Sequence, residues 1–191
     1  MMRIITGSAR GTKLDAPEGL STRPTAERVK EAVFSMLMAD FAERRVLDLF
    51  GGSGQLGLEA LSRGAREAVL VDAAREAVAV MQKNAVRTHL ENRARVLRSD
   101  ALSFLRTCRE DPFHFVFLDP PYASGLVPVC LSLLCERGLL SASARVICEV
   151  GDIADVFGEN RDLSEKFTVV KQNRYGAAHI VILTPKKERE A

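Results

Sequence analysis

Residues 46–57 read VLDLFGGSGQLG, and this stretch decides the fold class that the chain predicts. Its first five residues are apolar apart from Asp48, which is typical of a buried strand. The glycines that follow let the backbone turn tightly and approach a ligand closely, and a helical pattern begins near residue 55. Strand, glycine loop and helix in this order predict a ligand-binding turn of an α/β protein.

Short apolar strands alternate with helical stretches along most of the chain. Nearly all-apolar strands that alternate with helices are typical of a mostly parallel sheet covered by helices on both faces. Thr25 is a plausible N-cap for the first of these helices. We expect helices over residues 25–40, 55–63, 74–88, 101–109 and 125–136, and strands over 45–50, 68–72, 95–98, 113–118 and 145–149.

The end of the chain departs from this alternation. Two apolar runs, residues 167–173 and 178–183, flank Arg174-Tyr175-Gly176 with no helical stretch between them. A connection that short joins antiparallel strands, so we expect a hairpin at the end of the sheet.

The length of 191 residues suits one α/β domain with a full core. Short apolar pieces at Ile4-Ile5 and Leu14 indicate a small hairpin ahead of that domain. We expect an N-terminal extension over residues 1–24, the domain itself over 25–185 and a charged tail over 186–191.

The composition is that of an ordinary globular protein, with 47% hydrophobic residues and a net charge of +2. Four cysteines show neither a C-x-x-C pair nor a spacing to His that would indicate zinc, so we expect reduced thiols and no metal. No run approaches the roughly 18 apolar residues of a membrane span, and the start lacks the apolar run of a signal peptide. We expect a cytoplasmic protein that does not contact membranes.

Positive charge is concentrated near the N-terminus. Contact with nucleic-acid phosphates and an ordinary solvated surface both account for it, and charge alone does not decide between them. Arg23 and Arg28 stand at the start of the first expected helix, where the helix dipole does not favour a cation. Phosphate contact or an ion pair with Glu27 or Glu31 would explain them. The basic residues are Arg3, Arg10, Lys13, Arg23, Arg28 and Lys30.

The glycine loop predicts a nucleotide-like cofactor. Gly52, Gly54 and Gly57 satisfy G-x-G-x-x-G, a pattern that fits a nicotinamide dinucleotide as well as S-adenosylmethionine. In both cases Asp72, at the end of the next strand, is suited to accept hydrogen bonds from the ribose hydroxyls. Asp100 ends the third strand, where it can accept the adenine amino group or act as an N-cap.

Asp119-Pro120-Pro121-Tyr122 follows a buried strand and predicts the reaction. An exocyclic amine on a planar base has two N–H donors, and Asp119 and the carbonyl of Pro120 can accept one each. Tyr122 can stack on a base that has left its helix or loop. Direct displacement at a sulfonium methyl then depends on positioning and electrostatics, with no metal and no covalent cysteine. An isolated Asp-Pro-Pro-Tyr would also make an ordinary turn.

Together these segments resemble the class I methyltransferases and, within them, the RsmD family, whose members methylate guanine N2 in bacterial small-subunit ribosomal RNA. The match runs over nearly the whole chain. Its segments are Arg3-Ile4-Ile5 with Arg10-Gly11, Arg23-Pro24-Thr25 with residues 28–31, residues 50–60, the Asp-Pro-Pro-Tyr tetrad and Arg174-Tyr175-Gly176.

The resemblance implies a Rossmann-like fold with a seven-stranded, mostly parallel sheet that ends in an antiparallel strand. It implies S-adenosylmethionine as methyl donor and S-adenosylhomocysteine as product, with 16S rRNA, in the 30S subunit or an assembly intermediate, as the partner. The resemblance does not give the oligomeric state, and we expect a monomer. The predicted catalytic residues are Asp119, Pro120, Pro121 and Tyr122. The predicted cofactor residues are Asp48, Phe50, Gly52, Ser53, Gly54, Gly57, Asp72, Asp100 and Ala101, and the predicted RNA contacts are Arg10, Arg23, Thr25, Arg28 and Tyr175.

Two positions depart from the family pattern, with Gly51 where alanine is usual and Asp72 where glutamate is usual. Neither removes a chemical group that the reaction needs. Three other functions stay open: an adenine-N6 or cytosine-N4 methyltransferase, a nicotinamide-dependent oxidoreductase, and an RNA-binding module without activity. Packing of Tyr175 on the sheet is an alternative to a contact with RNA.

Overall fold

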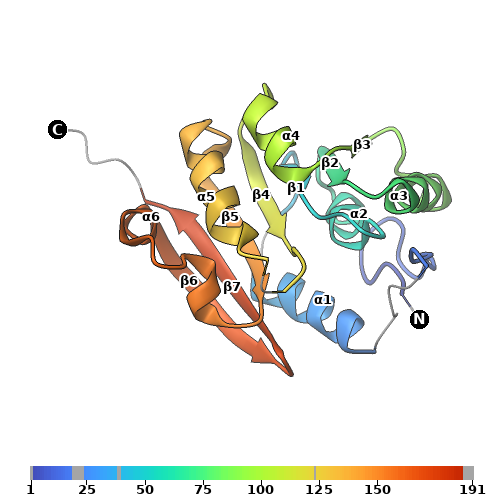
Figure 1. Cartoon of the computed structure of the whole chain (residues 1–191). Helices are drawn as coiled ribbons and strands as arrows, with labels where there is room; N and C mark the ends of the chain where they lie inside the picture. The colour runs from blue at the N-terminus through green and yellow to red at the C-terminus, as the bar shows by residue number, and fades with distance from the viewer. Residues whose placement is uncertain (1, 19–23, 38–39, 123, 187–191) are drawn as a thin grey trace. The chain divides into compact units, whose positions relative to one another are not determined.

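The computed structural model describes residues 2–18, 24–37, 40–122 and 124–186, with residues 24–28 described by their backbone alone. The chain forms two compact units, Met1–Ala101 and Leu102–Ala191 (Figure 1). Their seven strands belong to a mixed sheet, as the sequence predicts.

The strands of the first unit are parallel and end at a shared polar edge. Their order is β3-β2-β1. Leu47 is paired with Val69 and Asp48 with Leu70, so apolar residues fill the middle of the strands and carboxylates follow at their carboxyl ends. Asp72 is likewise the last residue of its strand. The strands are β1 (Arg45–Asp48), β2 (Glu67–Asp72) and β3 (Ala94–Arg98).

Two helices pack on these strands through apolar stripes. Leu58 and Leu61 of α2 are fully buried, and α2 contacts all three strands. Met81 of α3 is also fully buried, and α3 contacts β2 and β3. None of the helices in the described residues has the length and apolar character that a membrane crossing needs. The helices of this unit are α1 (Pro24–Leu37), α2 (Gln55–Ser62) and α3 (Arg75–Arg87).

The predicted N-terminal hairpin is present as a short ladder. Arg3 and Lys13 form an antiparallel bridge. The amide of Ile4 donates to the Thr12 carbonyl at 3.0 Å, and the amide of Leu14 donates to the Met2 carbonyl at 2.9 Å. Side chains of α2 and α3, rather than further strand pairing, attach this hairpin to the first unit.

Glu59 of α2 is the buried attachment point. Its carboxylate is fully buried and accepts the amides of Ile5 at 2.7 Å and Thr6 at 3.0 Å. The ammonium of Lys30, 1% exposed, lies 3.7 Å from the same carboxylate. Arg63 donates to it at 2.9 Å. The helix face that packs on the sheet therefore also fixes the start of the chain.

Asp15 makes a second, exposed attachment to α3. Its carboxylate pairs with Lys83 at 2.7 Å and with Arg87 at 2.6 Å. Hydrogen bonds from these two cations hold the pKa of Asp15 at about 2, below its usual value of 3.8. The N-terminal segment is thus fastened at one buried and one exposed carboxylate.

The second unit continues the alternation and then reverses. In the strand order β4-β5-β7-β6, β4 and β5 are parallel, and β7 is antiparallel to both of its neighbours. This confirms the predicted C-terminal hairpin. The elements are α4 (Ala101–Thr107), β4 (Phe113–Leu118), α5 (Leu126–Glu136), β5 (Leu140–Val150), η1 (Ile153–Val156), α6 (Arg161–Glu165), β6 (Phe167–Tyr175) and β7 (Ala178–Pro185).

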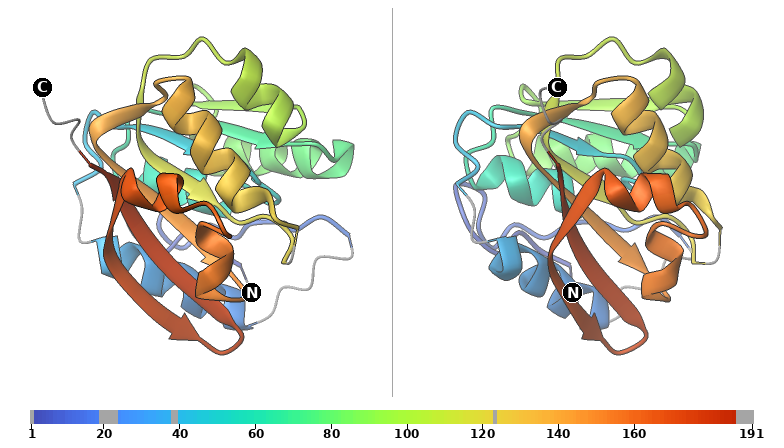
Figure 2. Two further views of the ribbon diagram at one scale, coloured as in Figure 1. Left: turned by 60° about the vertical axis from the view of Figure 1, so that its left-hand side comes forward. Right: turned by 90° about the vertical axis from the view of Figure 1, so that its left-hand side faces the viewer.

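Helices cover the strands of this unit. Both α6 and η1 contact α5, while η1 also contacts β5 and β7, and α6 contacts β6. Figure 2 shows β6 and β7 as a long hairpin beside these short helices. Strand β7 has a buried run from Ile180 to Leu183, whereas residues 168–174 of β6 are exposed. The sheet therefore ends in an exposed edge strand.

The structure differs from the sequence prediction in three places. Strand β5 begins at Leu140, five residues before the predicted start, and η1 and α6 were not predicted. Asp152 caps η1, and the Asn160 side chain accepts the Leu163 amide at the start of α6. Elements of four and five residues rest on such local caps and are too short to show a helical period. Helix α1 is described to Leu37, and residues 38–39 of the predicted helix lie outside the described residues.

Replacing Glu59 by alanine is predicted to destabilise the protein strongly. The change leaves the buried Lys30 ammonium without this carboxylate and removes the acceptor for two amides of the N-terminal segment. We expect a loss of about 3–5 kcal/mol in the free energy of unfolding, measured by urea denaturation. Asp15→Ala, which removes an exposed attachment of the same segment, is the control and should cause a much smaller loss. Equal losses in the two variants would contradict the role given to Glu59.

Candidate active site

The loop between β1 and α2 has the backbone of a ligand-binding turn. Gly52 and Gly54 both have positive φ angles, of 53° and 76°, which favour glycine. The amide of Gly51 donates to the Val71 carbonyl of β2, at 2.8 Å. The loop is thereby fixed against the neighbouring strand. The amino end of α2, which follows directly, attracts anionic or electron-rich groups.

Two other glycines of this loop and helix make room for close packing. A side chain at Gly57 would overlap Leu70 of β2, and its Cβ would lie 3.4 Å from the Cβ of Asp48. A side chain at Gly51 would overlap the sulfur of Met81. Gly51 is one of the two positions at which the sequence departs from the pattern it resembles, and in this chain Met81 occupies the space that a methyl group would need.

Asp72 braces the glycine loop. One carboxylate oxygen accepts the Gly52 amide at 2.9 Å, and the other accepts the Ala74 amide at 2.8 Å. Each oxygen of a carboxylate has a further lone pair, so both can also accept from a ligand. The residue is half-buried at the end of β2. It is therefore positioned by the backbone before any ligand arrives.

Asp48 is enclosed, in contrast to Asp72. It is 2% exposed, and its carboxylate accepts the Gly57 amide at 3.0 Å. Burial raises its pKa from 3.8 to about 7, although the hydrogen bond from Gly57 acts in the opposite direction and the negative charge of Asp72 adds to the increase. Its place in the structure is that of a support for the start of α2.

Asn84 of α3 joins the loop to the N-terminal segment, and sequence reasoning missed it. The fully buried side chain donates to the carbonyls of Ser53 and Asp15, both at 2.9 Å, and accepts the Asp15 amide at 2.9 Å. The Ser53 hydroxyl in turn donates to the sulfur of Met2 at 3.0 Å. The hydroxyl predicted to meet the cofactor therefore faces the start of the chain. No spacing pattern marks a buried amide in the middle of a helix.

The remaining predicted cofactor residues lie at the ends of strands in the first unit. Phe50 is half-buried just after β1. Asp100 is exposed between β3 and α4, and Ala101 begins α4 with a buried side chain. All nine predicted cofactor residues thus belong to the first unit.

The predicted catalytic tetrad belongs to the second unit and directly follows β4. Asp119 and Pro121 are exposed and Pro120 is buried. Tyr122 is 55% exposed, which is unusual for an aromatic side chain on a structured turn. Its hydroxyl donates to Glu149 of β5 at 2.9 Å. An accessible acid and an accessible aromatic ring therefore stand on the same turn, and the ring has a fixed partner.

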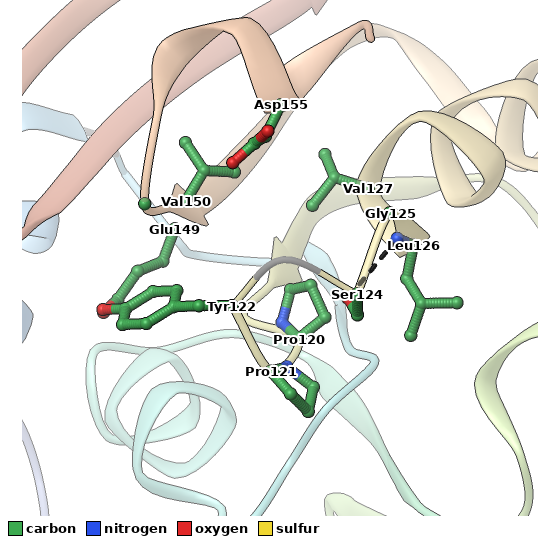
Figure 3. A pocket seen from close by; sticks show the side chains of 11 residues that line it. Pro120, Pro121, Tyr122, Ser124, Gly125, Leu126, Val127, Glu149, Val150 and Asp155 are labelled. Atoms are coloured by element: carbon green, nitrogen blue, oxygen red, sulfur yellow. Dashed lines mark hydrogen bonds between the residues drawn. The ribbon is translucent and has the colours of Figure 1, made fainter.

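A pocket beside the tetrad brings Glu149 into the site. It is lined by the two prolines and Tyr122 from the turn, by the start of α5, and by Glu149 and residues near it (Figure 3). Burial raises the pKa of the Glu149 carboxyl above its usual value, although the Tyr122 hydrogen bond lowers it. Burial and the charges of Glu149 and Asp119 raise the pKa of Tyr122, so the phenol stays protonated. The sequence did carry a signal for Glu149, since it closes a predicted strand as the other site acids do.

The predicted RNA-contacting residues are only partly described. Arg10 is exposed in the N-terminal hairpin. Tyr175 is half-buried at the end of β6, where its hydroxyl accepts the Asn173 amide group at 3.3 Å. Arg23, and the side chains of Thr25 and Arg28, lie outside the described residues. Among the residues described, no group of three or more His, Cys, Asp or Glu side chains could hold a metal ion.

Comparisons with known proteins cover most of the chain. A family model described as "Conserved hypothetical protein 95" matches residues 2–184. The Bacillus subtilis protein YlbH is 41% identical over 150 residues, which are 78% of this chain and 82% of YlbH. Escherichia coli ribosomal RNA small subunit methyltransferase D is 40% identical over 148 residues, 78% of this chain and 74% of that protein. The solved structure of Escherichia coli yhhF has a TM-score of 0.82 at 33% identity and covers 97% of this chain and 98% of its own.

Replacing Asp48 by asparagine is predicted to change how stability depends on pH. The folded protein keeps a proton on Asp48 up to a pKa of about 7, whereas the unfolded chain releases it near 3.8. The contribution of Asp48 to stability is therefore fully present below pH 3.8 and is lost as the pH rises towards 7. Asparagine keeps an acceptor for the Gly57 amide and cannot ionise.

Urea denaturation of wild type and Asp48→Asn across that pH window should show the variant gaining on the wild type as the pH rises, by at most about 1.4 kcal/mol per pH unit. Glu91→Gln, which alters an exposed acid of the same unit, should follow the wild type throughout. Parallel profiles for Asp48→Asn and wild type would rule out Asp48 as the titrating group.

Proposed function

Because the chain belongs to the RsmD family, we propose that it transfers a methyl group from S-adenosylmethionine to the exocyclic N2 amine of a guanine in small-subunit (16S) ribosomal RNA. The observation that carries this proposal is the turn after β4, where Asp119 and the ring of Tyr122 are both exposed beside the buried Pro120. The relatives that support an RNA substrate include the Escherichia coli and Haemophilus influenzae proteins named ribosomal RNA small subunit methyltransferase D.

The first unit is the proposed binding site for S-adenosylmethionine. The glycine loop leads into the amino end of α2, and Asp72, half-buried at the end of β2, has lone pairs left for two ribose hydroxyls. Asp100, exposed at the end of β3, is the proposed acceptor for the adenine amino group. Asp48 is proposed to support the loop indirectly, through its hydrogen bond with the Gly57 amide of α2. When bound, the cofactor supplies an electrophilic sulfonium methyl. Phe50, Gly52, Ser53, Gly54, Gly57 and Ala101 complete the proposed site.

The tetrad of the second unit is the proposed catalytic group. The lone pair of a base amine is delocalised into the ring, so the amine reacts better when both of its hydrogens are held and the lone pair faces the sulfonium methyl group. Asp119 is proposed to accept one N–H, and the carbonyl of Pro120 to accept the other. Tyr122 is proposed to stack on the base, since its ring is exposed on the same turn. After transfer, the surplus proton on the nitrogen passes to Asp119 or to water.

The proposed RNA contacts come from both units. Arg10 is exposed on a hairpin fastened to α2 and α3, so a phosphate could bind there without reordering the chain. Arg23, Thr25, Arg28 and Tyr175 complete the proposed set.

We take residues 1–24 as the extension, 25–185 as the methyltransferase domain and 186–191 as the tail. The proposed partner is 16S rRNA in the 30S subunit or an assembly intermediate, which places the protein in the cytoplasm, and we propose a monomer.

Radiolabel transfer tests the proposed activity. Purified protein is incubated with S-adenosylmethionine labelled with tritium in the methyl group and with 30S particles from a strain that lacks this enzyme. Label should enter the small-subunit RNA, and particles from a wild-type strain, already methylated, should accept little. Unlabelled RNA in the first sample would contradict the proposal.

Asp119→Ala is predicted to lower the rate of methyl transfer about a hundredfold or more while leaving cofactor binding intact. The acid is proposed to hold the amine and belongs to the second unit, whereas the proposed cofactor residues lie in the first. Single-turnover label transfer measures the rate, and the thermal shift caused by S-adenosylhomocysteine measures binding. Glu159→Ala, an exposed acid of the same unit, should behave as wild type. A wild-type rate in Asp119→Ala would refute the proposed catalytic role.

A further inference from the structure

Glu149 is a partly buried carboxylate for which the proposed reaction has no use. It lies near the carboxyl end of β5, in the pocket beside the tetrad. Within the described part of the chain, one oxygen accepts the Tyr122 hydroxyl at 2.9 Å, and no cation is paired with it. The hydroxyl is a neutral donor and satisfies one of several acceptor positions of a carboxylate.

A carboxylate in this setting gains from a second donor. Removing a charged group from water costs free energy unless hydrogen bonds or counter-charges replace the lost hydration. The raised pKa of Glu149 is a sign of that cost. The second oxygen of Glu149, a residue that lines the pocket, is therefore an acceptor that a ligand with an N–H group can satisfy. Figure 3 shows Glu149 reaching the hydroxyl end of Tyr122, with Pro120 and Pro121 at the other end of the ring.

The three bases with an exocyclic amine differ in the atom next to that amine. In guanine the N2 amine lies beside N1, which carries a hydrogen. In adenine the N6 amine lies beside N1, and in cytosine the N4 amine lies beside N3, and both of these ring nitrogens carry a lone pair instead. An acceptor placed next to the amine therefore attracts guanine and repels adenine and cytosine.

We propose that Glu149 is the residue that selects guanine. One oxygen is held by the Tyr122 hydroxyl, and the other accepts the N1–H of the base that stacks on the Tyr122 ring. This inference rests on the proposed function and adds a chemical basis for the choice of base. The charges of Glu149 and Asp119 both raise the pKa of the Tyr122 hydroxyl, so two carboxylates lie in the surroundings of that ring. Asp119 would hold the N2 amine, and Glu149 would accept the hydrogen of the adjacent N1.

The test compares guanine with 2-aminopurine at the methylated position of an rRNA assembled by splinted ligation and reconstituted into 30S particles. 2-Aminopurine keeps the C2 amine but has a lone pair on N1. The wild type should prefer guanine. Glu149→Gln replaces the carboxylate by a neutral amide that can present either its oxygen or its NH2 group to N1, so its preference for guanine over 2-aminopurine in kcat/KM should fall about tenfold or more. If the wild type methylates guanine but Glu149→Gln keeps the wild-type preference for guanine over 2-aminopurine, the role proposed for Glu149 is overturned. The proposed function would then still stand.

Two control variants separate recognition from structure. Tyr122→Phe removes the hydroxyl but keeps the Glu149 carboxylate, and should lower the rate while retaining the preference for guanine. An equal loss of preference in Tyr122→Phe would mean that the Tyr122 hydroxyl, rather than the second oxygen of Glu149, selects the base, which overturns the proposal. Asp155→Asn removes a different negative charge from the edge of the same pocket and should keep the preference. The melting temperature and the thermal shift with S-adenosylhomocysteine show that each variant is folded. A wild type that methylates no guanine would overturn the proposed function as well.

Discussion

The close packing of α2 against β1 and β2 is the constraint on which the first unit depends. Gly57 has no side chain where one would overlap Leu70, and its amide is bound by the buried Asp48. This approach fixes the start of α2 and therefore the glycine loop before it. It also fixes Glu59, two residues further on, which holds the N-terminal segment. The contacts of Gly57 with Leu70 and with the Asp48 carboxylate thus position both the glycine loop and the N-terminal segment.

The fold was largely predictable because its main signals are local. Apolar strands, a glycine turn and helical periods identified the alternating elements, and the short connection near Gly176 identified the final antiparallel strand. Short elements with local caps, η1 and α6, were not predictable from periodicity. The family followed from the combination of segments along the chain, and the matching family model confirms it.

The site residues were predictable where an acid or a glycine follows or ends a strand. Polar side chains within helices were harder to predict. Asp72 braces the loop as its position suggests, whereas Asp48 is enclosed and Ser53 faces Met2. Asn84 and Glu59 could not be found from the sequence, because a polar side chain in a helix shows its partners only after distant segments have folded against it. Glu149 was missed although it closes a predicted strand as the other site acids do, because its contact with Tyr122, 27 residues away in the sequence, appears only in the fold.

The proposed activity is defined by the nucleoside that the protein produces. An exposed acid and ring on one turn suit any exocyclic amine, and Glu149, hydrogen-bonded to the Tyr122 hydroxyl, is the residue proposed to favour the base whose amine has an N–H neighbour. Mass spectrometry of nucleosides from 30S rRNA, methylated by the purified protein, measures this directly. The expected product is N2-methylguanosine, and N6-methyladenosine or N4-methylcytidine as the product would contradict the proposed activity.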